Sequence, residues 1–306
     1  MDIKDLIIEF SETRPESEII VGYGSKVKSQ ANDKGVQKQI DLILGVENSL
    51  DWHSQNYEMN PEDYKSKLGY KLLPLYQKFG TKINYISYLP FKNHMFKIGV
   101  VEKSDLIYDL VNWENFFLAG RFQKPIEIIK GSNELNLAIK INRINALKTA
   151  LLASGKDKIS EQELYETLCS LSFMGDFRQI LHIETKNKVK NIVEGSFEEL
   201  HNMYSMLNNG YYEKDDNDQL IINYDVLLSK LNTLPNDLRL QLLKCLFNEI
   251  NNKSIDDEVL NKIRKTIIEY FTHMNLKTSS AQPIKGLILN GTSKSLTYVN
   301  QKLAKK

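Results

Sequence analysis

The chain has 306 residues, more than most single hydrophobic cores hold, and this length predicts two domains with an appended segment. The sequence is 42% hydrophobic and 26% charged, as is typical of globular proteins, and its net charge of +1 disfavours a dedicated nucleic-acid-binding protein. The two cysteines, Cys169 and Cys245, lie far apart without metal-ligand spacing, so we expect reduced thiols that fill the core. No apolar run reaches the roughly 20 residues that a membrane-spanning helix needs.

In chain order, the first 134 residues alternate between helical and strand patterns. Apolar residues at helical spacing predict helices over residues 2–10, 51–73 and 106–117. Runs of β-branched and aliphatic residues predict strands over residues 18–24, 39–46, 82–89, 94–102 and 124–129. This mixture predicts an α/β or α+β domain over residues 1–134.

The rest of the chain is mostly helical in pattern. Ser160 is expected to cap a helix, with Glu163 completing a capping box three residues later. Helices are predicted over residues 137–153, 161–171, 238–251 and 256–274, together with one that follows Gly195-Ser196 through residue 207. Residues 208–218 are predicted to be a polar turn region. We therefore divide this half into residues 135–225, 226–276 and a tail over 277–306, which holds six lysines and no acidic residue.

A glycine–serine pair, Gly24-Ser25, ends the first predicted strand, and Asp41 lies inside the second. Glycine lets backbone N–H groups approach a phosphate closely, and a carboxylate on a neighbouring strand is suited to hold the Mg²⁺ of a nucleoside triphosphate. The layout resembles the polymerase-β type of nucleotidyltransferase. Taken alone, however, a Gly-Ser pair after a strand is more typical of an ordinary turn.

Further motifs in the same order resemble the mitochondrial translocator assembly and maintenance protein family, whose members are peripheral CDP-diacylglycerol synthases. The motifs that carry the resemblance are Tyr23-Gly24-Ser25-Lys26-Val27, Gln30, residues 40–46, Trp52-His53, Asn56, Lys97-x-Gly99-Val100, Asn112-Trp113, residues 119–125, residues 172–178 and Lys285-Gly286. They extend over nearly the whole chain. The resemblance implies an α+β protein with an N-terminal polymerase-β-like nucleotidyltransferase domain, a winged-helix-like middle domain and a helical C-terminal segment that contacts the membrane.

The resemblance also implies the reaction and its site. CTP and phosphatidic acid would be the substrates, Mg²⁺ the cofactor, and Asp41 the metal ligand. The residues expected in catalysis are Asp41, Lys97 and Asp176. The residues expected to bind nucleotide or phosphate are Tyr23, Gly24, Ser25, Gln30, Arg121, Lys124 and Arg178.

The sequence departs from the wider superfamily at Ile43, where the second acid of an Asp-x-Asp pair would fall. We interpret this through the acceptor, because a phosphate oxygen is already largely ionised near neutral pH and needs alignment and charge neutralisation more than a base. Lys97, Arg121 and Lys124 are suited to that role. The simpler alternatives are a solvent-facing strand lysine at 97, ordinary loop charges at 121 and 124, and a helix cap for Asp176 that pairs with Arg178.

The tail carries an apolar face on a helical spacing, formed by Leu296, Val299 and Leu303, with Lys294 and Lys302 beside it. Such a segment is predicted to contact an anionic membrane surface, and a frayed tail is the alternative. We expect that deleting residues 277–306 leaves CTP binding intact. The acidic N-terminus lacks the features of a signal or transit peptide, which favours the cytoplasmic face of the cell membrane over the matrix side of the mitochondrial inner membrane.

Two other functions remain open at this stage. One is a nucleotidyltransferase acting on a protein, an RNA or a small alcohol. The other is a winged-helix DNA-binding regulator with an inactive nucleotide domain. Because the net charge is near zero, we expect no nucleic-acid partner, and salt-dependent duplex binding would distinguish this class.

Overall fold

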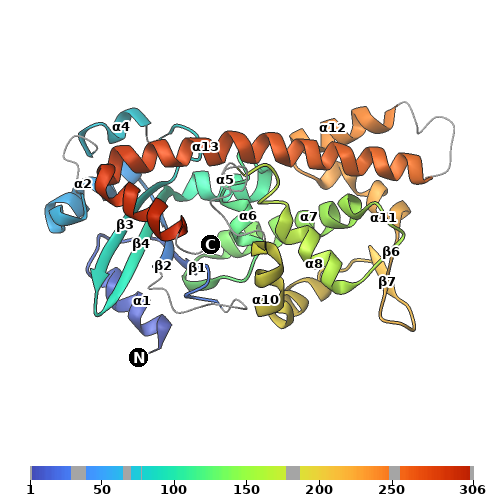
Figure 1. Ribbon diagram of the computed structural model, residues 1–306, viewed down its shortest axis with the longest axis horizontal. Coiled ribbons are helices and arrows are strands. Elements are labelled where there is room, and N and C mark those ends of the chain that lie inside the picture. The colour runs from blue at the N-terminus through green and yellow to red at the C-terminus, as the bar shows by residue number, and fades with distance from the viewer. Residues whose placement is uncertain are drawn as a thin grey trace.

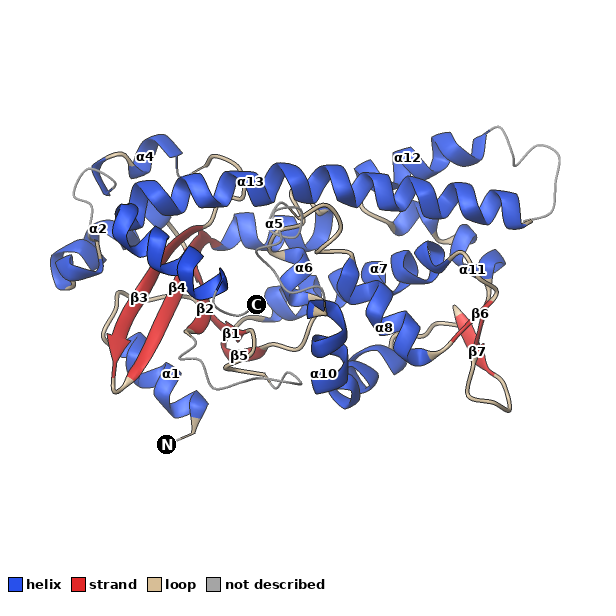
Figure 2. Ribbon diagram, viewed as in Figure 1, coloured by secondary structure: helices blue, strands red, loops and turns tan. Residues whose placement is uncertain are grey.

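A computed structural model describes residues 2–28, 39–64, 70–76, 78–176, 187–247 and 256–303, without the side chains of 281–284 and 286–303. The fold is mixed α+β, with one sheet at each end of an elongated molecule and helices between and above them (Figures 1 and 2). The predicted α+β class is therefore confirmed.

The larger sheet has five strands in the order β3-β4-β2-β1-β5. Its strands are β1 (Ile19–Tyr23), β2 (Ile40–Val46), β3 (Asn84–Phe91), β4 (His94–Glu102) and β5 (Glu127–Lys130). β2 and β4 are parallel and the other neighbours are antiparallel. A hairpin through Asn93 joins β3 to β4. The last strand begins later than predicted, so Lys124 lies before it rather than in it.

Alternate residues of these strands point into two separate cores. One face packs under α1 (Ile3–Glu12) and α2 (Ser49–Met59). The opposite face, which includes Val21 and Ile43, joins the core beneath α5 (Lys103–Asn112), α6 (Ala119–Phe122) and α7 (Asn133–Ser154). Both faces of the central strands are covered, which explains why β1 and β2 are almost continuously apolar.

The helix predicted over residues 51–73 is shorter and interrupted. α2 ends before the 3₁₀ turn Pro61–Asp63, and a short helix, α4 (Leu73–Tyr76), follows residues 65–69, which are outside the described part. His53 is fully buried on α2 and its Nδ1 lies 2.7 Å from the Tyr64 hydroxyl. Burial lowers the pKa of His53 to about 3, so this ring stays neutral and packs as part of the structure.

The second half is built on the long helix α7. Its three-stranded sheet, in the order β6-β8-β7, consists of β6 (Lys158–Ile159), β7 (Tyr212–Lys214) and β8 (Leu220–Ile222). The helices are α8 (Glu161–Ser170), α10 (Lys188–Ser205), α11 (Tyr224–Ser229), the 3₁₀ turn η2 (Leu231–Thr233) and α12 (Asn236–Phe247). The capping box of Ser160 and Glu163 is confirmed.

Two expectations in this half were wrong. The region 208–218 is not only a turn, because β7 lies in it; its short, polar sequence gives little strand signal. The helix expected to start after Gly195-Ser196 begins earlier, and Ser196 is a kink within α10 with φ −135°. A glycine followed by serine therefore bends this helix rather than starting it.

The last element, α13 (Asp257–Leu303), runs along one side of the molecule from α12 to α4, where it bends, and its last part turns back toward the end of the chain (Figure 1). It packs on α12, α7 and the edge strand β3. The helix continues through position 277, where the sequence analysis begins the tail. Thr278, Ser279 and Lys285 beyond that position are buried.

Candidate active site

The register of the large sheet brings together three of the predicted site residues. Tyr23 of β1 and Lys97 of β4 are the direct partners of Asp41 on β2. Directly paired residues project from the same face of a sheet, so these side chains form one row. Lys97 Nζ lies 3.4 Å from Asp41 Oδ1, and about a quarter of each side chain is exposed. Asp41 is therefore a solvent-accessible carboxylate beside a cation.

The chain turns sharply beside this row. Gly24 has φ +80°, a conformation that favours glycine, and its carbonyl accepts hydrogen bonds from the amides of Val27 and Lys28. A Cβ at position 24 would lie 3.3 Å from Asp41 Oδ2. Ser25 lies in this turn. The glycine therefore both forms the turn and leaves the second oxygen of Asp41 open.

Lys97 is held over an aromatic ring. Its Nζ lies 4.3 Å from the centre of the Tyr85 ring, which packs across Gly99. A Cβ at Gly99 would come within 2.5 Å of Tyr85 Cε1, so a side chain there would displace the ring. This contact gives a physical reason for the Lys97-x-Gly99 motif.

Arg121 of α6 approaches the row from the helical side. Its guanidinium lies 3.7 Å from the centre of the Phe117 ring and 5.7 Å from that of Tyr23. The Tyr23 hydroxyl lies 3.3 Å from that of Tyr85. Burial raises the pKa of Tyr23 to about 12, and the nearby Asp41 charge adds to this effect. Tyr23 therefore stays neutral and links Arg121 to the Asp41 row.

Lys124 lies behind Arg121, where two segments approach closely. Its Nζ donates to the Gly120 carbonyl and to Ser172 Oγ, both at 2.6 Å. Burial lowers the pKa of Lys124 to about 8, and the positive charges of Arg121 and Lys188 act in the same direction. Lys188, at the start of α10, was not predicted; only the fold brings it near residue 124.

The segment that carries Arg121 is fixed by a buried carboxylate. The two oxygens of Asp109 accept hydrogen bonds from the backbone amides of residues 115, 116, 118 and 119 at 2.9–3.1 Å. Asn142 on α7 adds a second anchor, since its Nδ2 donates to the Ala119 carbonyl and its Oδ1 accepts from Trp113 and Gln123. Asp109 therefore acts as a positioning residue, and its isolated position gave no sequence signal.

Replacing Asp109 with alanine should destabilise the protein by about 3 kcal/mol or more, because four buried N–H groups lose their acceptor. Chemical denaturation measures this loss. Asp105→Ala on the same helix is the matched control, because its carboxylate pairs with Lys82 near the surface and should matter little. Equal stability of the two variants would contradict this assignment.

The Ser172–Asp176 loop joins Lys124 to α13. Asn275 Nδ2 donates to the carbonyls of Leu171 and Met174, and Gly175 lies so close to Thr272 that a Cβ would come within 2.5 Å of its carbonyl oxygen. Asp176 is buried at the end of this loop. Its catalytic role stays a prediction.

The other predicted residues are not placed in this arrangement. Gln30 and Arg178 lie outside the described residues. The backbone of α13 is helical through Leu303, but the side chains of Lys294, Leu296, Val299, Lys302 and Leu303 are not described. Ile43 is fully buried in the core on the same face as Asp41. A packed aliphatic side chain, that of Ile43, therefore occupies the position where the second acid would lie.

The carboxylate of Asp41 could hold a Mg²⁺ ion if the other ligands came from substrate and water. Within the described part of the chain, no three His, Cys, Asp or Glu side chains are grouped to hold a metal. Mg²⁺ is commonly held by one or two carboxylates together with phosphate oxygens and water. The partly exposed Asp41 and the absence of a side chain at Gly24 suit that donor set.

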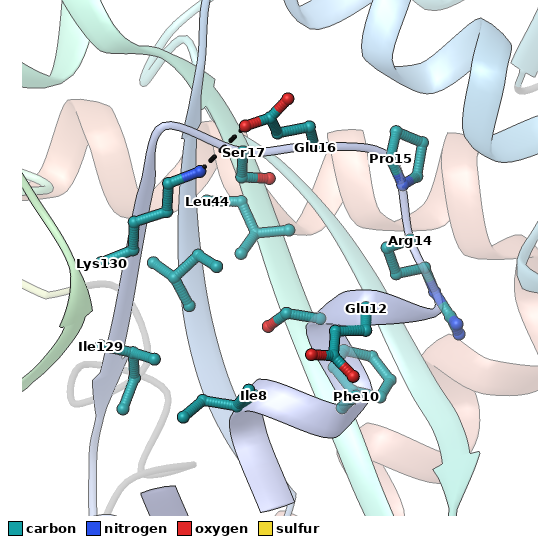
Figure 3. Close-up of a pocket in the computed structure, with 12 residues that line it drawn as sticks. Ile8, Phe10, Glu12, Arg14, Pro15, Glu16, Ser17, Leu44, Ile129 and Lys130 are labelled. Atoms are coloured by element: carbon teal, nitrogen blue, oxygen red, sulfur yellow. Dashed lines mark hydrogen bonds and ion pairs between the residues drawn. The ribbon is translucent and has the colours of Figure 1, made fainter. Parts of the chain in front are cut away.

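A cavity of about 450 Å³ lies on the other face of the sheet, between α1 and strands β1, β2 and β5 (Figure 3). Leu44 lines it, and since Leu44 is three residues from Asp41 the two side chains project from opposite faces. An ion pair of Glu16 with Lys130, at 3.1 Å, borders its opening. This cavity is therefore separate from the Asp41 site.

The fold and the site define an α+β protein with a candidate phosphate-binding centre, built from a glycine turn, one carboxylate and several cations. The chain belongs to the mitochondrial phosphatidate cytidylyltransferase family, because the model described as "Phosphatidate cytidylyltransferase, mitochondrial" matches residues 4–305.

Relatives with that name are similar over nearly the whole chain. The Schizosaccharomyces pombe protein is 30% identical, with 94% of this chain and 80% of the relative covered. The Saccharomyces cerevisiae protein is 31% identical, with 96% and 68% covered. The Mus musculus protein is 29% identical, with 92% and 88% covered. These comparisons confirm the family resemblance recognised in the sequence.

Proposed function

We propose that this protein transfers the cytidylyl group of CTP to phosphatidic acid and releases CDP-diacylglycerol and pyrophosphate, a step in phospholipid synthesis such as that of phosphatidylglycerol and cardiolipin. The structural observation that most directly supports this function is the row of Tyr23, Asp41 and Lys97 beside the Gly24 turn. The names of the relatives support this substrate pair.

In the proposed reaction, a phosphatidate oxygen forms a bond to the α-phosphorus of CTP. The bond from that phosphorus to the bridging oxygen breaks, and pyrophosphate leaves with the electron pair. The acceptor oxygen is ionised at neutral pH, because the second pKa of a phosphomonoester is about 6. No protein base is then needed, in agreement with the aliphatic Ile43 at the second-acid position.

The side chains have distinct proposed roles. The Gly24-Ser25 turn presents backbone and hydroxyl donors to the triphosphate, and Lys97 neutralises charge at the reacting phosphates. Arg121, stacked on Phe117, is suited to bidentate contact with an anionic oxygen pair. When bound at Asp41, Mg²⁺ would supply charge neutralisation and alignment of the triphosphate.

The finer domain assignment remains part of this proposal. A polymerase-β-like nucleotidyltransferase domain would occupy residues 1–134, with the Asp41 site on its five-stranded sheet. A winged-helix-like domain would occupy residues 135–225, where α7, α8 and α10 pack on one another and the chain also forms the small β6-β8-β7 sheet. The described part of the chain contains no helix long and apolar enough to cross a membrane.

We also propose that the protein works at an anionic membrane surface, which it contacts partly through the end of α13. The relatives' names include the word mitochondrial, which agrees with the matrix-side alternative for the compartment. The cell membrane, favoured from the N-terminal sequence, gains no support from the comparisons.

The direct test uses purified protein, Mg²⁺, labelled CTP and phosphatidate dispersed in detergent. Formation of labelled CDP-diacylglycerol with release of one pyrophosphate is expected. Diacylglycerol, which offers a hydroxyl instead of a phosphate, should not be an acceptor. Transfer to diacylglycerol, to RNA or to protein instead of phosphatidate would identify the alternative nucleotidyltransferase.

Lys124 should make the reaction sensitive to alkaline pH. With a pKa of about 8, this lysine is protonated and attracts phosphate below that pH and loses its charge above it. We therefore expect kcat/KM to fall as the pH rises through 8, and to fall roughly 10- to 100-fold in Lys124→Ala at pH 7. Lys124→Arg keeps its charge and should remove the alkaline decline. An unchanged profile in this variant would assign the decline to another group.

A further inference from the structure

The segment around α4 presents two large apolar side chains to solvent. Leu75 is 80% exposed and Phe79 is 59% exposed. They are four residues apart in the chain. Two neighbouring apolar residues of the same segment, Leu73 and Tyr76, are buried. Burial of Leu73 and Tyr76 means that the backbone is held by packing while Leu75 and Phe79 remain exposed.

The charged residues along this stretch of the sequence are all lysines, and Lys82, Lys92 and Lys97 among them pair with acids from elsewhere in the chain. Residues 64–101 include seven lysines and no aspartate or glutamate, an unusual run in a chain of net charge +1. Lys71, four residues before Leu75, and Lys78, between Leu75 and Phe79, are both exposed. The exposed part therefore combines two large apolar side chains with two lysines, which is complementary to a bilayer with anionic headgroups.

The segment is also fixed to the C-terminal helix. Lys285 on α13 is buried, and its Nζ donates to the Phe79 carbonyl at 3.0 Å. α13 packs against β3, the strand that follows this segment and carries Tyr85 beneath Lys97. Figure 1 shows α4 beside the bend of α13, beyond which the last part of this helix turns back toward the end of the chain marked C. The exposed pair is thus rigidly connected both to the helix that ends in the basic tail and to the candidate active site.

We propose that Leu75 and Phe79 insert into the interfacial layer of an anionic lipid bilayer, with Lys71 and Lys78 contacting its headgroups. This inference rests on the proposed function, since a phosphatidate substrate resides in such a bilayer. The proposed insertion is a second membrane contact besides that of the tail. Two contacts fix the orientation of the large sheet relative to the membrane, whereas a single contact would leave the protein free to rotate about it.

The test compares full-length variants in sedimentation with vesicles of phosphatidylcholine containing phosphatidate. Leu75→Ser/Phe79→Ser should bind at least about fivefold more weakly than the unchanged protein. Leu240→Ser/Phe247→Ser on α12 is the matched control, because those side chains are also exposed and lie elsewhere on the surface. Equal weakening of both variants, or of neither, would overturn the proposal.

Activity on detergent-dispersed short-chain phosphatidate keeps this inference separate from the proposed function. The Leu75/Phe79 variant should retain that activity while losing activity on vesicles. If the unchanged protein has no transferase activity, the proposed function fails, and vesicle binding still decides whether the segment contacts lipid.

A fluorescent variant provides evidence that does not depend on loss of function. The two native tryptophans, Trp52 and Trp113, are buried, so Phe79→Trp adds an exposed reporter. Its emission should shift to shorter wavelength with phosphatidate vesicles, and brominated lipid should quench it. An unchanged emission spectrum while the protein is vesicle-bound would refute insertion. An emission shift that appears with a copurifying protein but not with vesicles would mean that the segment binds a protein partner instead.

Discussion

Asp41→Asn should lower turnover by roughly 10³-fold or more, with little change in folding stability. The substitution keeps the shape of the side chain but removes the one carboxylate charge available in the Tyr23–Asp41–Lys97 row. It also removes the attraction between Asp41 and Lys97. That pair is separated by 3.4 Å and partly exposed, so its loss should change the free energy of unfolding by no more than about 1 kcal/mol.

Glu47→Gln is the matched control for this change. Glu47 is exposed just beyond the far end of β2, and at about 3.3 Å per residue it lies about 20 Å along the strand from Asp41. Initial rates across Mg²⁺ concentrations, with thermal unfolding of both variants, give the comparison. Substantial Mg²⁺-dependent activity in Asp41→Asn would mean that the metal is held elsewhere. Loss of activity in Glu47→Gln would mean that the site extends across the sheet.

The residues at the centre of the candidate site could be singled out from the sequence because they lie in strongly patterned strands. Asp41 and Lys97 occupy runs of aliphatic residues that bury both faces, and such runs are among the clearest strand signals. The Gly24 turn was recognisable because a glycine after a strand often adopts positive φ. The parallel pairing of β2 with β4, which sets Lys97 beside Asp41, required the structure.

The supporting residues could not be predicted because their partners are distant in sequence. Asp109 looks like any acidic residue on a helix, and its role arises only when residues 115–119 fold back over it. Lys188 approaches Lys124 across 64 positions of the chain. Short strands such as β6 and β8 have too few residues for a periodic pattern. Tertiary contacts, rather than local propensity, determine these features.

Two truncations should separate the structural and membrane roles of α13. Deleting residues 277–306 was expected from the sequence to leave CTP binding intact, but the deletion removes buried Thr278, Ser279 and Lys285. Removing Lys285 deprives the Phe79 carbonyl of a charge-assisted hydrogen bond. Because of this loss alone, the free energy of unfolding should fall by about 2 kcal/mol. The change should also loosen the segment around Phe79, and CTP affinity should fall with it because β3 follows that segment.

Deleting residues 288–306 instead keeps Lys285 and removes Lys294, Leu296, Val299, Lys302 and Leu303. This shorter deletion should preserve the midpoint of thermal unfolding and the affinity for CTP, while binding to anionic vesicles falls several-fold and becomes less sensitive to salt. Activity on vesicles should fall far more than activity on dispersed phosphatidate. If the shorter deletion weakens CTP binding as much as the longer one, the end of α13 serves the active site directly. If it binds vesicles like the full chain, the segment around Leu75 and Phe79 is sufficient for membrane contact.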